Sequence, residues 1–225
     1  MIKYKYVLFD LDGTVSASAD GIRMSLEHAL DTLGVPKPDL DDYTQYIGPP
    51  LIDTFKNLCG LDDETAEKGA ALYREYYDKE GKYHNKVYDG IKELVFELRK
   101  KGAKTAICTS KQKPVADGVA KLLGIEDWFD KIVGSTLDNK IKDKKDLIPY
   151  ALAFLGGDIE RDRADTVMIG DSRFDAVGAK LCEVDFIGVS YGFGDRDEML
   201  RCPCIGFADT PMDVLRILEE RGRTT

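Results

Sequence analysis

The sequence has few of the side chains that build soft-metal sites or disulfide frameworks. Its two histidines, His28 and His84, have no second histidine or cysteine at metal-ligand spacing. Its five cysteines are an odd number and form no CxxC pair, so neither a disulfide framework nor a zinc site is indicated. The pair Cys202 and Cys204 is interpreted as two small residues in a turn. We therefore expect reduced thiols.

Long apolar runs and an excess of positive charge are also absent. The apolar run before Asp10 has only four residues, too few for a signal-peptide core or a membrane span, and no later run is of spanning length. The net charge of -9 disfavours nucleic acids and anionic membranes, because the long-range field repels polyanions. We expect a cytoplasmic protein that binds no membrane and no nucleic-acid polymer. The sequence does not indicate an oligomeric state.

The chain does contain short β-branched and aromatic runs that alternate with helical patterns. This alternation predicts an α/β fold with a Rossmann-like parallel sheet covered by helices on both faces. With 43% hydrophobic residues in 225, the chain can bury a sizeable core without disulfides. The predicted strands are Tyr6–Phe9, Thr105–Cys108, Lys131–Val133, Val167–Ile169 and Phe186–Val189.

Residues 16–88 interrupt this alternation. They contain no strand by periodicity, and a helix-breaking bend lies at Ile47-Gly48-Pro49-Pro50. We expect an all-helical cap domain at 16–88, inserted into a catalytic core made of 1–15 and 89–225. The predicted cap helices lie near Gly21–Leu33, Leu51–Cys59 and Glu64–Lys79.

The first candidate site residues are Asp10 and Asp12, which come directly after a predicted buried strand and are followed by Gly13. Glycine permits the tight curl that would let two carboxylates separated by one residue converge on one point. Such carboxylates can attack phosphorus, hold a hard cation and move a proton. A calcium loop or a solvated turn is the alternative for this motif taken alone.

A second acidic pair, Asp171 and Asp175, follows the predicted strand Val167–Ile169. Aspartates four apart at the start of a helix are expected to face the same way, so both can reach a cation held by Asp10. Mg²⁺ prefers a few carboxylate oxygens together with substrate phosphate and water. The alternative is that Asp171 only caps the helix.

Hydroxyl and amino groups complete the candidate site. Thr109 and Ser110 follow the strand Thr105–Cys108, where they can donate to a phosphate oxygen with help from Lys111, although they can also be simple helix caps. A phosphoryl group among several aspartates needs a further cation. Of the four lysines in 139–146 we choose Lys144, because it directly precedes an apolar helical pattern; a neighbouring lysine remains the alternative.

One arginine of the predicted cap is also a candidate. Arg23 lies in the first predicted cap helix, and an arginine there can form a bidentate pair with a substrate carboxylate or phosphate. Most helix arginines are solvated, so a plain surface position is the alternative.

Together these motifs resemble the haloacid dehalogenase superfamily of phosphatases. DxDGT at 10–14, a Thr/Ser after the second strand, a lysine before a helix and GDxxxD at 170–175 occur in the order and spacing of that superfamily. The segments 47–51 and 191–194 are similar to its phosphoglycolate phosphatase-like and bacterial 5′-nucleotidase-like branch. The chain departs from related sequences at Ala17, where they carry Asp, and at Gln112, where they carry Pro.

The resemblance implies a role for each motif residue. Asp10 would be the nucleophile and Asp12 the general acid and base. Mg²⁺ would be held by Asp10, Asp171, Asp175 and the backbone carbonyl of Asp12. The implied catalytic residues also include Thr109 and Lys144, and the implied phosphate-binding residues are Asp10, Gly13, Thr14, Thr109, Ser110 and Lys144.

The predicted function is therefore hydrolysis of a small phosphorylated metabolite, such as phosphoglycolate or a 5′-nucleotide, through an aspartyl-phosphate intermediate. Two alternatives remain, of which the first has the same motifs and the second uses a similar set of aspartates, hydroxyl and lysine. One is a phosphomutase that passes the phosphoryl group to a sugar hydroxyl. The other is a phospho-accepting signalling domain without turnover, against which the DxD pair and the inserted cap count.

Overall fold

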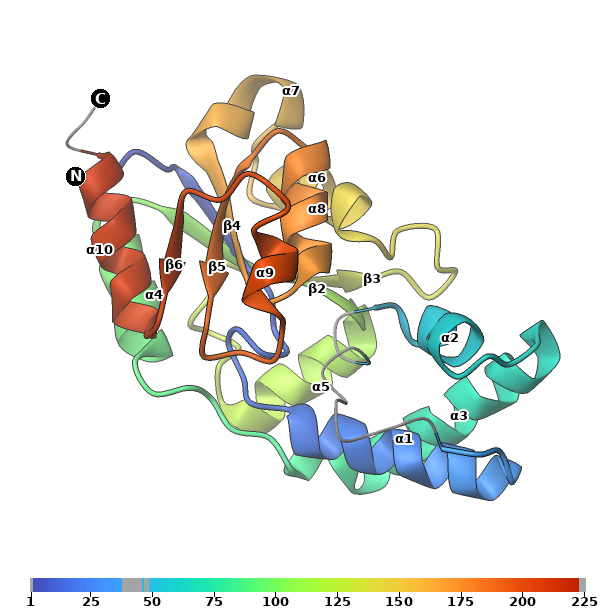
Figure 1. Ribbon diagram of the computed structural model, residues 1–225. Coiled ribbons are helices and arrows are strands. Elements are labelled where there is room, and N and C mark those ends of the chain that lie inside the picture. The colour runs from blue at the N-terminus through green and yellow to red at the C-terminus, as the bar shows by residue number, and fades with distance from the viewer. Residues whose placement is uncertain (1, 38–45, 47–48, 223–225) are drawn as a thin grey trace.

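The computed structural model describes residues 2–37, 46 and 49–222. Its centre is a parallel six-stranded sheet with the order β3-β2-β1-β4-β5-β6 (Figure 1). No helix within these described ranges is both long and apolar enough to cross a membrane. The α/β, Rossmann-like fold predicted from the sequence is confirmed. The strands are β1 (Tyr6–Phe9), β2 (Lys104–Gln112), β3 (Lys131–Ser135), β4 (Thr166–Gly170), β5 (Asp185–Val189) and β6 (Gly206–Ala208).

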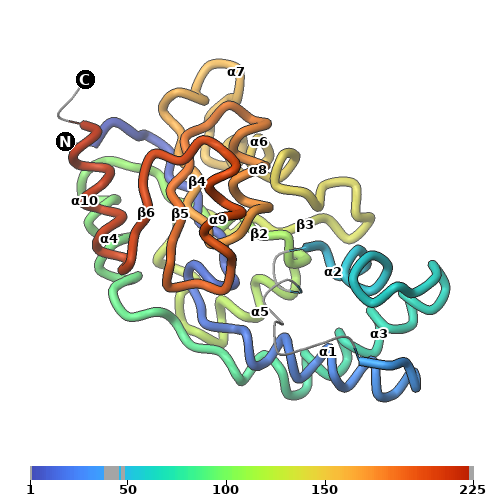
Figure 2. The backbone as a smooth tube through the Cα atoms, in the orientation of Figure 1, coloured from blue at the N-terminus to red at the C-terminus, as the bar shows by residue number. Residues whose placement is uncertain are grey.

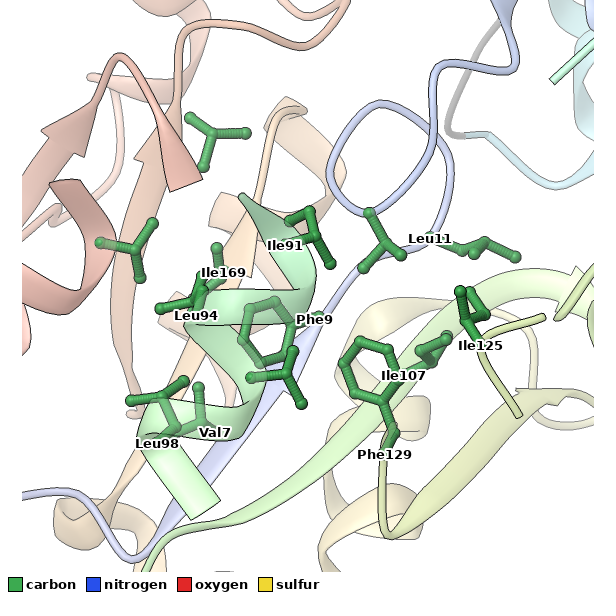
Figure 3. Close-up of a cluster of buried hydrophobic side chains, with 14 of the residues drawn as sticks. Val7, Phe9, Leu11, Ile91, Leu94, Leu98, Ile107, Ile125, Phe129 and Ile169 are labelled. Atoms are coloured by element: carbon green, nitrogen blue, oxygen red, sulfur yellow. The ribbon is translucent and has the colours of Figure 1, made fainter. Parts of the chain in front are cut away.

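Helices cover both faces of the sheet. Successive side chains of a strand point to opposite faces, so β1 contributes to two separate cores. Val7 and Phe9 of β1 enter the core under α4 (Ile91–Lys100), α5 (Lys113–Leu123) and α10 (Pro211–Arg221), and Figure 3 shows Phe9 beside Leu94 in this core. Tyr6 and Leu8 enter the other core. That core is formed with α6 (Lys144–Phe154), α8 (Arg173–Leu181) and α9 (Arg196–Met199), and the remaining short elements are α7 (Ile159–Asp162) and the 3₁₀ turn Arg163–Asp165.

All the regular elements described between β1 and α4 are helical, apart from isolated bridges at Ser16. Its own small core surrounds the fully buried Phe55, with Leu26, Leu30 and Ala70 among its neighbours. Figures 1 and 2 show α1, α2 and α3 grouped apart from the helices that cover the sheet. The elements are α1 (Ala19–Leu33), α2 (Leu51–Asp53), a π-helical turn (Thr54–Leu58), α3 (Asp63–Lys79) and a 3₁₀ turn (Gly81–Tyr83).

One predicted helix of this segment differs from the observed one. Instead of a uniform helix over Leu51–Cys59, α2 has three residues and continues into the π-helical turn, where the N–H of Cys59 donates to the carbonyl of Thr54 at 3.1 Å. Apolar periodicity does not separate one wide turn from the α-helical period, so the sequence could not predict it. Ile47 and Gly48 of the predicted bend lie outside the described residues, and Pro50 directly precedes α2.

The two connections between the helical segment and the core lie side by side. Ser16 forms an antiparallel bridge with Val87, the N–H of Ala17 donates to the Lys86 carbonyl at 2.8 Å, and the N–H of Tyr88 donates to the Val15 carbonyl at 3.1 Å. Both connections are therefore held together directly after the sequence that carries Asp10 and Asp12.

Candidate active site

The candidate residues gather at the carboxyl ends of three adjacent strands. β1 pairs with β2 on one side and with β4 on the other, so Asp10 after β1, Thr109 near the end of β2 and Asp171 after β4 meet at one edge of the sheet. The sequence predicted that Thr109 and Ser110 follow the second strand, but the structure shows that they belong to β2. The strand extends to Gln112 because β3 continues the pairing, with an irregular register between Thr109 and Gln112.

Three buried carboxylates form the centre of the site. Oxygens of Asp10, Asp171 and Asp175 lie within 4.8 Å of one another, and each residue is at most 3% exposed. Burial raises the pKa of Asp10; Lys144 opposes this shift, while Asp175 and Asp171 add to it. Burial, followed by the charge of Asp175, also raises the pKa of Asp171. Keeping Asp10 and Asp171 ionised therefore requires positive charge close by.

Lys144 supplies one such charge. Its Nζ lies 2.7 Å from Oδ1 of Asp10 and 2.6 Å from Oδ1 of Asp175, and donates to the Cys108 carbonyl at 2.7 Å. Burial by itself would lower the pKa of the Lys144 ammonium, but Asp10 and Asp175 raise it above the ordinary value. Within the run 139–146, the structure brings this lysine alone to the aspartates. Lys140 and Lys145 are exposed.

The geometry around α8 differs from the predicted one. Asp171 neither caps the helix nor lies on it, because α8 begins at Arg173 and Ser172 is its N-cap, joined to Asp175 in a reciprocal capping box. Asp171 is held instead by the hydroxyl of Thr14, which donates to Oδ1 at 3.2 Å, and by the N–H of Phe193, which donates to Oδ2 at 2.8 Å. The turn before the helix, and not helical spacing, brings the two aspartates together.

Gly13 allows the chain to pass directly over Asp171. Its φ is +85°, and a Cβ atom at this position would lie 2.1 Å from Oδ2 of Asp171. Its N–H donates to the Ser16 carbonyl at 2.8 Å, and the side chain of Thr14 is fully buried against Asp171. The structure thus places Gly13 and Thr14 against Asp171, where they shape the loop.

Asp12 lies apart from the three buried carboxylates. Oδ1 accepts from the hydroxyl of Ser18 at 2.6 Å, and Nζ of Lys111 lies 3.1 Å from Oδ1 and 3.0 Å from Oδ2. Lys111 also donates to the Tyr77 hydroxyl of α3 at 3.0 Å. Burial would lower the pKa of Lys111, yet Asp12 and Tyr77 together raise it. Asp10 and Asp12, which are separated by one residue, therefore have different surroundings.

Sequence reasoning did not find Ser18 and Tyr77. The N-terminal motif offers no local sign that the Ser18 hydroxyl turns back to Asp12. Tyr77 is 34 residues away from Lys111 in the sequence, so only the packing of α3 against the core brings the two together.

A cavity of about 650 Å³ lies between the helical segment and the core, and it opens onto Asp10 and Asp12. Thr109, Ser110 and Lys111 line it from the core, and Tyr73 and Tyr77 line it from α3. The other lining residues include Ile22, Leu26, Leu51, Asp53, Lys56, Glu67, Arg74, Asp78, Lys82, Ser135 and Lys142. A ligand in this cavity would contact the aspartates and the helical segment at the same time.

Comparison with known proteins shows the family and the fold of the chain. Residues 7–189 match the family model described as haloacid dehalogenase-like hydrolase. The chain is 38% identical over 198 residues to a 5'-nucleotidase of Pseudomonas aeruginosa, covering 88% of each chain. It is 39% identical over 191 residues to the tyrosine-protein kinase PtkA of Mycobacterium tuberculosis, covering 85% of this chain and 64% of that protein.

Among solved structures, a predicted phosphatase from Clostridium acetobutylicum superposes with a TM-score of 0.89 at 35% identity. The match covers 96% of this chain and 99% of that one, so it includes the helical segment as well as the sheet.

Proposed function

The chain belongs to the haloacid dehalogenase-like hydrolase family and is an enzyme of its phosphatase kind, and from that premise we propose that it is a Mg²⁺-dependent phosphomonoester hydrolase with Asp10 as nucleophile. The observation that carries this proposal is the contrast between Asp10 and Asp12. Both line the cavity, but Asp10 belongs to the buried acidic cluster, whereas Asp12 is paired with Lys111. The two carboxylates are thus suited to different steps.

In this mechanism a carboxylate oxygen of Asp10 attacks the phosphorus of the ester, and the bond between phosphorus and the leaving oxygen breaks. Asp12 gives a proton to that leaving oxygen and then takes a proton from the water that hydrolyses the aspartyl phosphate. Thr109, Ser110 and Lys144 hold the oxygens of the transferring group, and Gly13 with Thr14 shapes the loop beneath it. The helical segment over the cavity limits access of bulk water.

The donor set fits a hard divalent cation. Three buried carboxylates against the one ammonium of Lys144 leave two negative charges, and every ligand atom of the cluster is an oxygen. Asp10, Asp171 and Asp175, with the backbone carbonyl of Asp12, would hold Mg²⁺. When bound, the ion would neutralise charge on the phosphoryl oxygens.

Metal removal gives the first prediction. We expect EDTA to abolish hydrolysis of p-nitrophenyl phosphate, and excess Mg²⁺ to restore it, because the buried carboxylates and an incoming phosphate otherwise repel each other. The measurement is the initial rate across a Mg²⁺ titration after chelation. Full activity in EDTA would refute the metal role, whereas restoration only by a soft ion such as Zn²⁺ would refute the choice of ion.

The direct test of the function is kcat/KM over a panel of phosphomonoesters with Mg²⁺. The proposal requires release of inorganic phosphate from several small esters, with saturation. A protein that remains phosphorylated and releases no phosphate would instead be a phospho-accepting domain.

Lys111 gives a second prediction. Lys111→Met should lower kcat roughly 10- to 100-fold, because Asp12 loses the partner that orients it for proton transfer. Tyr77→Phe, which removes only the hydroxyl that contacts Lys111, should have a smaller effect. Lys113→Met is the matched control, since Lys113 pairs with Asp117 on the surface. Steady-state kcat and KM are measured for all three variants, and an unchanged kcat in Lys111→Met would remove Lys111 from the mechanism.

Transfer to an acceptor hydroxyl is a second candidate function, favoured by the similarity to PtkA, which is named a tyrosine-protein kinase. The two functions are distinguished by the fate of the phosphoryl group. Hydrolysis transfers the phosphoryl group to water and yields inorganic phosphate, whereas a phosphotransferase or mutase transfers it to an acceptor hydroxyl and yields a phosphorylated acceptor. Added sugars and tyrosine peptides, followed by mass spectrometry of the products, decide between them.

A further inference from the structure

The basic side chains that line the cavity differ in whether a carboxylate is paired with them. Five line it, and four of these are paired with carboxylates in the described part of the chain. The pairs are Lys56 with Asp63, Lys82 with Asp78, Lys111 with Asp12 and Lys142 with Asp53. Arg74 is the fifth, and no described residue forms an ion pair or a hydrogen bond with it.

Arg74 also lies on the helix that contacts the core side of the cavity. It is half-buried on α3, directly after Tyr73 and three residues before Tyr77, and all three residues line the cavity. Tyr77 contacts Lys111, which in turn holds Asp12. One face of α3 therefore carries Arg74 on the same side as the residues next to the proposed proton donor.

The acidic neighbours on α3 do not neutralise Arg74. Asp78 lies four residues further along the helix, and its Oδ1 forms an ion pair with Nζ of Lys82 at 2.6 Å. Glu67 is exposed and lies two turns earlier, about 10 Å along the helix axis. The cavity therefore holds one guanidinium with free donors facing a space that a ligand can enter.

We propose that Arg74 binds a second anionic group of the substrate, so that the preferred substrate is a small phosphomonoester or phosphoanhydride whose leaving group carries a carboxylate or another phosphate. This rests on the proposed phosphatase function. A guanidinium matches either anion with two parallel hydrogen bonds, and the charge makes each of them stronger than a neutral one. An uncharged leaving group, such as a nucleoside, would leave these donors unused. Arg23, the arginine suggested by the sequence, is instead paired with Glu27 at 2.9 Å.

The test compares esters that differ only in the second charge. Phosphoglycolate and ethyl phosphate share a two-carbon leaving group, pyrophosphate supplies the second phosphate, and p-nitrophenyl phosphate reports basal activity. Arg74→Met should lower kcat/KM for phosphoglycolate, pyrophosphate or both roughly 10- to 100-fold, mostly through KM. The loss on ethyl phosphate and p-nitrophenyl phosphate should stay below about threefold. Arg74→Lys should recover part of the loss, and Lys82→Met, which removes a cation already paired, should not distinguish the esters.

The phosphoglycolate and pyrophosphate arms identify which anion is bound. Equal losses on charged and uncharged leaving groups, or a wild-type preference for ethyl phosphate or a 5′-nucleotide, would overturn the role of Arg74 and leave the phosphatase function intact. If the wild-type protein with Mg²⁺ hydrolyses none of these compounds, including p-nitrophenyl phosphate, the proposed function and this inference both fail.

Discussion

Asp10→Asn should abolish turnover while the protein stays folded. The amide is a poor nucleophile, and no other carboxylate lies where it could replace Asp10, because Asp171 and Asp175 are fixed by Thr14, Phe193 and Ser172. We expect a fall in kcat of at least about 10³-fold, as is typical when a covalent nucleophile is removed. Rates on p-nitrophenyl phosphate, with Asp117→Asn as a surface control, measure it.

Stability provides the internal check on this variant. Burial raises the pKa of Asp10 although Lys144 opposes the shift, and Asp175 and Asp171 add to it, so a neutral side chain of the same shape removes a buried charge and its repulsion from the other two carboxylates. The thermal midpoint should therefore fall by no more than about 4 °C, which is roughly 1 kcal/mol for a chain of this length. Activity close to that of the wild type would exclude Asp10 as the nucleophile.

Trapping the intermediate separates covalent from direct hydrolysis. Acid quenching of the wild-type enzyme during turnover of a radiolabelled phosphoester should leave label on the protein, and Asp10→Asn should show none. Label in the variant would place the nucleophile at another residue.

Lys144→Met should cause the second large loss. Its ammonium is the cation that the described structure places against Asp10, so removing it withdraws charge from the transferring phosphoryl group. Loss of one electrostatic donor of this kind lowers kcat roughly 10²- to 10³-fold. Lys140→Met, Lys142→Met and Lys145→Met are matched controls from the same run and should retain most activity. A larger loss in Lys145→Met than in Lys144→Met would contradict the assignment.

Lys144→Met is also expected to be less stable, which must be separated from its chemistry. Leaving Asp10 and Asp175 buried without their cation costs about 3–5 kcal/mol. Thermal unfolding shows whether the variant is folded at the assay temperature. Lys144→Arg retains the charge, so it should recover stability more fully than activity, because the larger guanidinium cannot occupy the same contacts.

Most of the fold was predictable because local patterns and sheet packing agree. Runs of three or four residues were long enough to identify five of the strands, and the predicted strand Tyr6–Phe9 is β1 itself. β6 was missed because its three residues, Gly206–Ala208, carry no strand pattern, and pairing with β5 makes them a strand. β2 continues past Cys108 for the same reason, since its last residues pair with β3.

The sequence by itself determined the family, the α/β fold and the short list of acidic residues. It did so because motifs such as DxDGT are contiguous and their chemistry follows from residue type and spacing. Tertiary structure alone decided which lysine of 139–146 meets Asp10, that Ser172 and not Asp171 caps α8, and that Asp12 is held by Ser18 and Lys111. It alone also left Arg74 without a partner among the described residues of the cavity. These outcomes depend on contacts between segments far apart in the chain, whose energies arise only when helices and strands pack, and no local pattern encodes them.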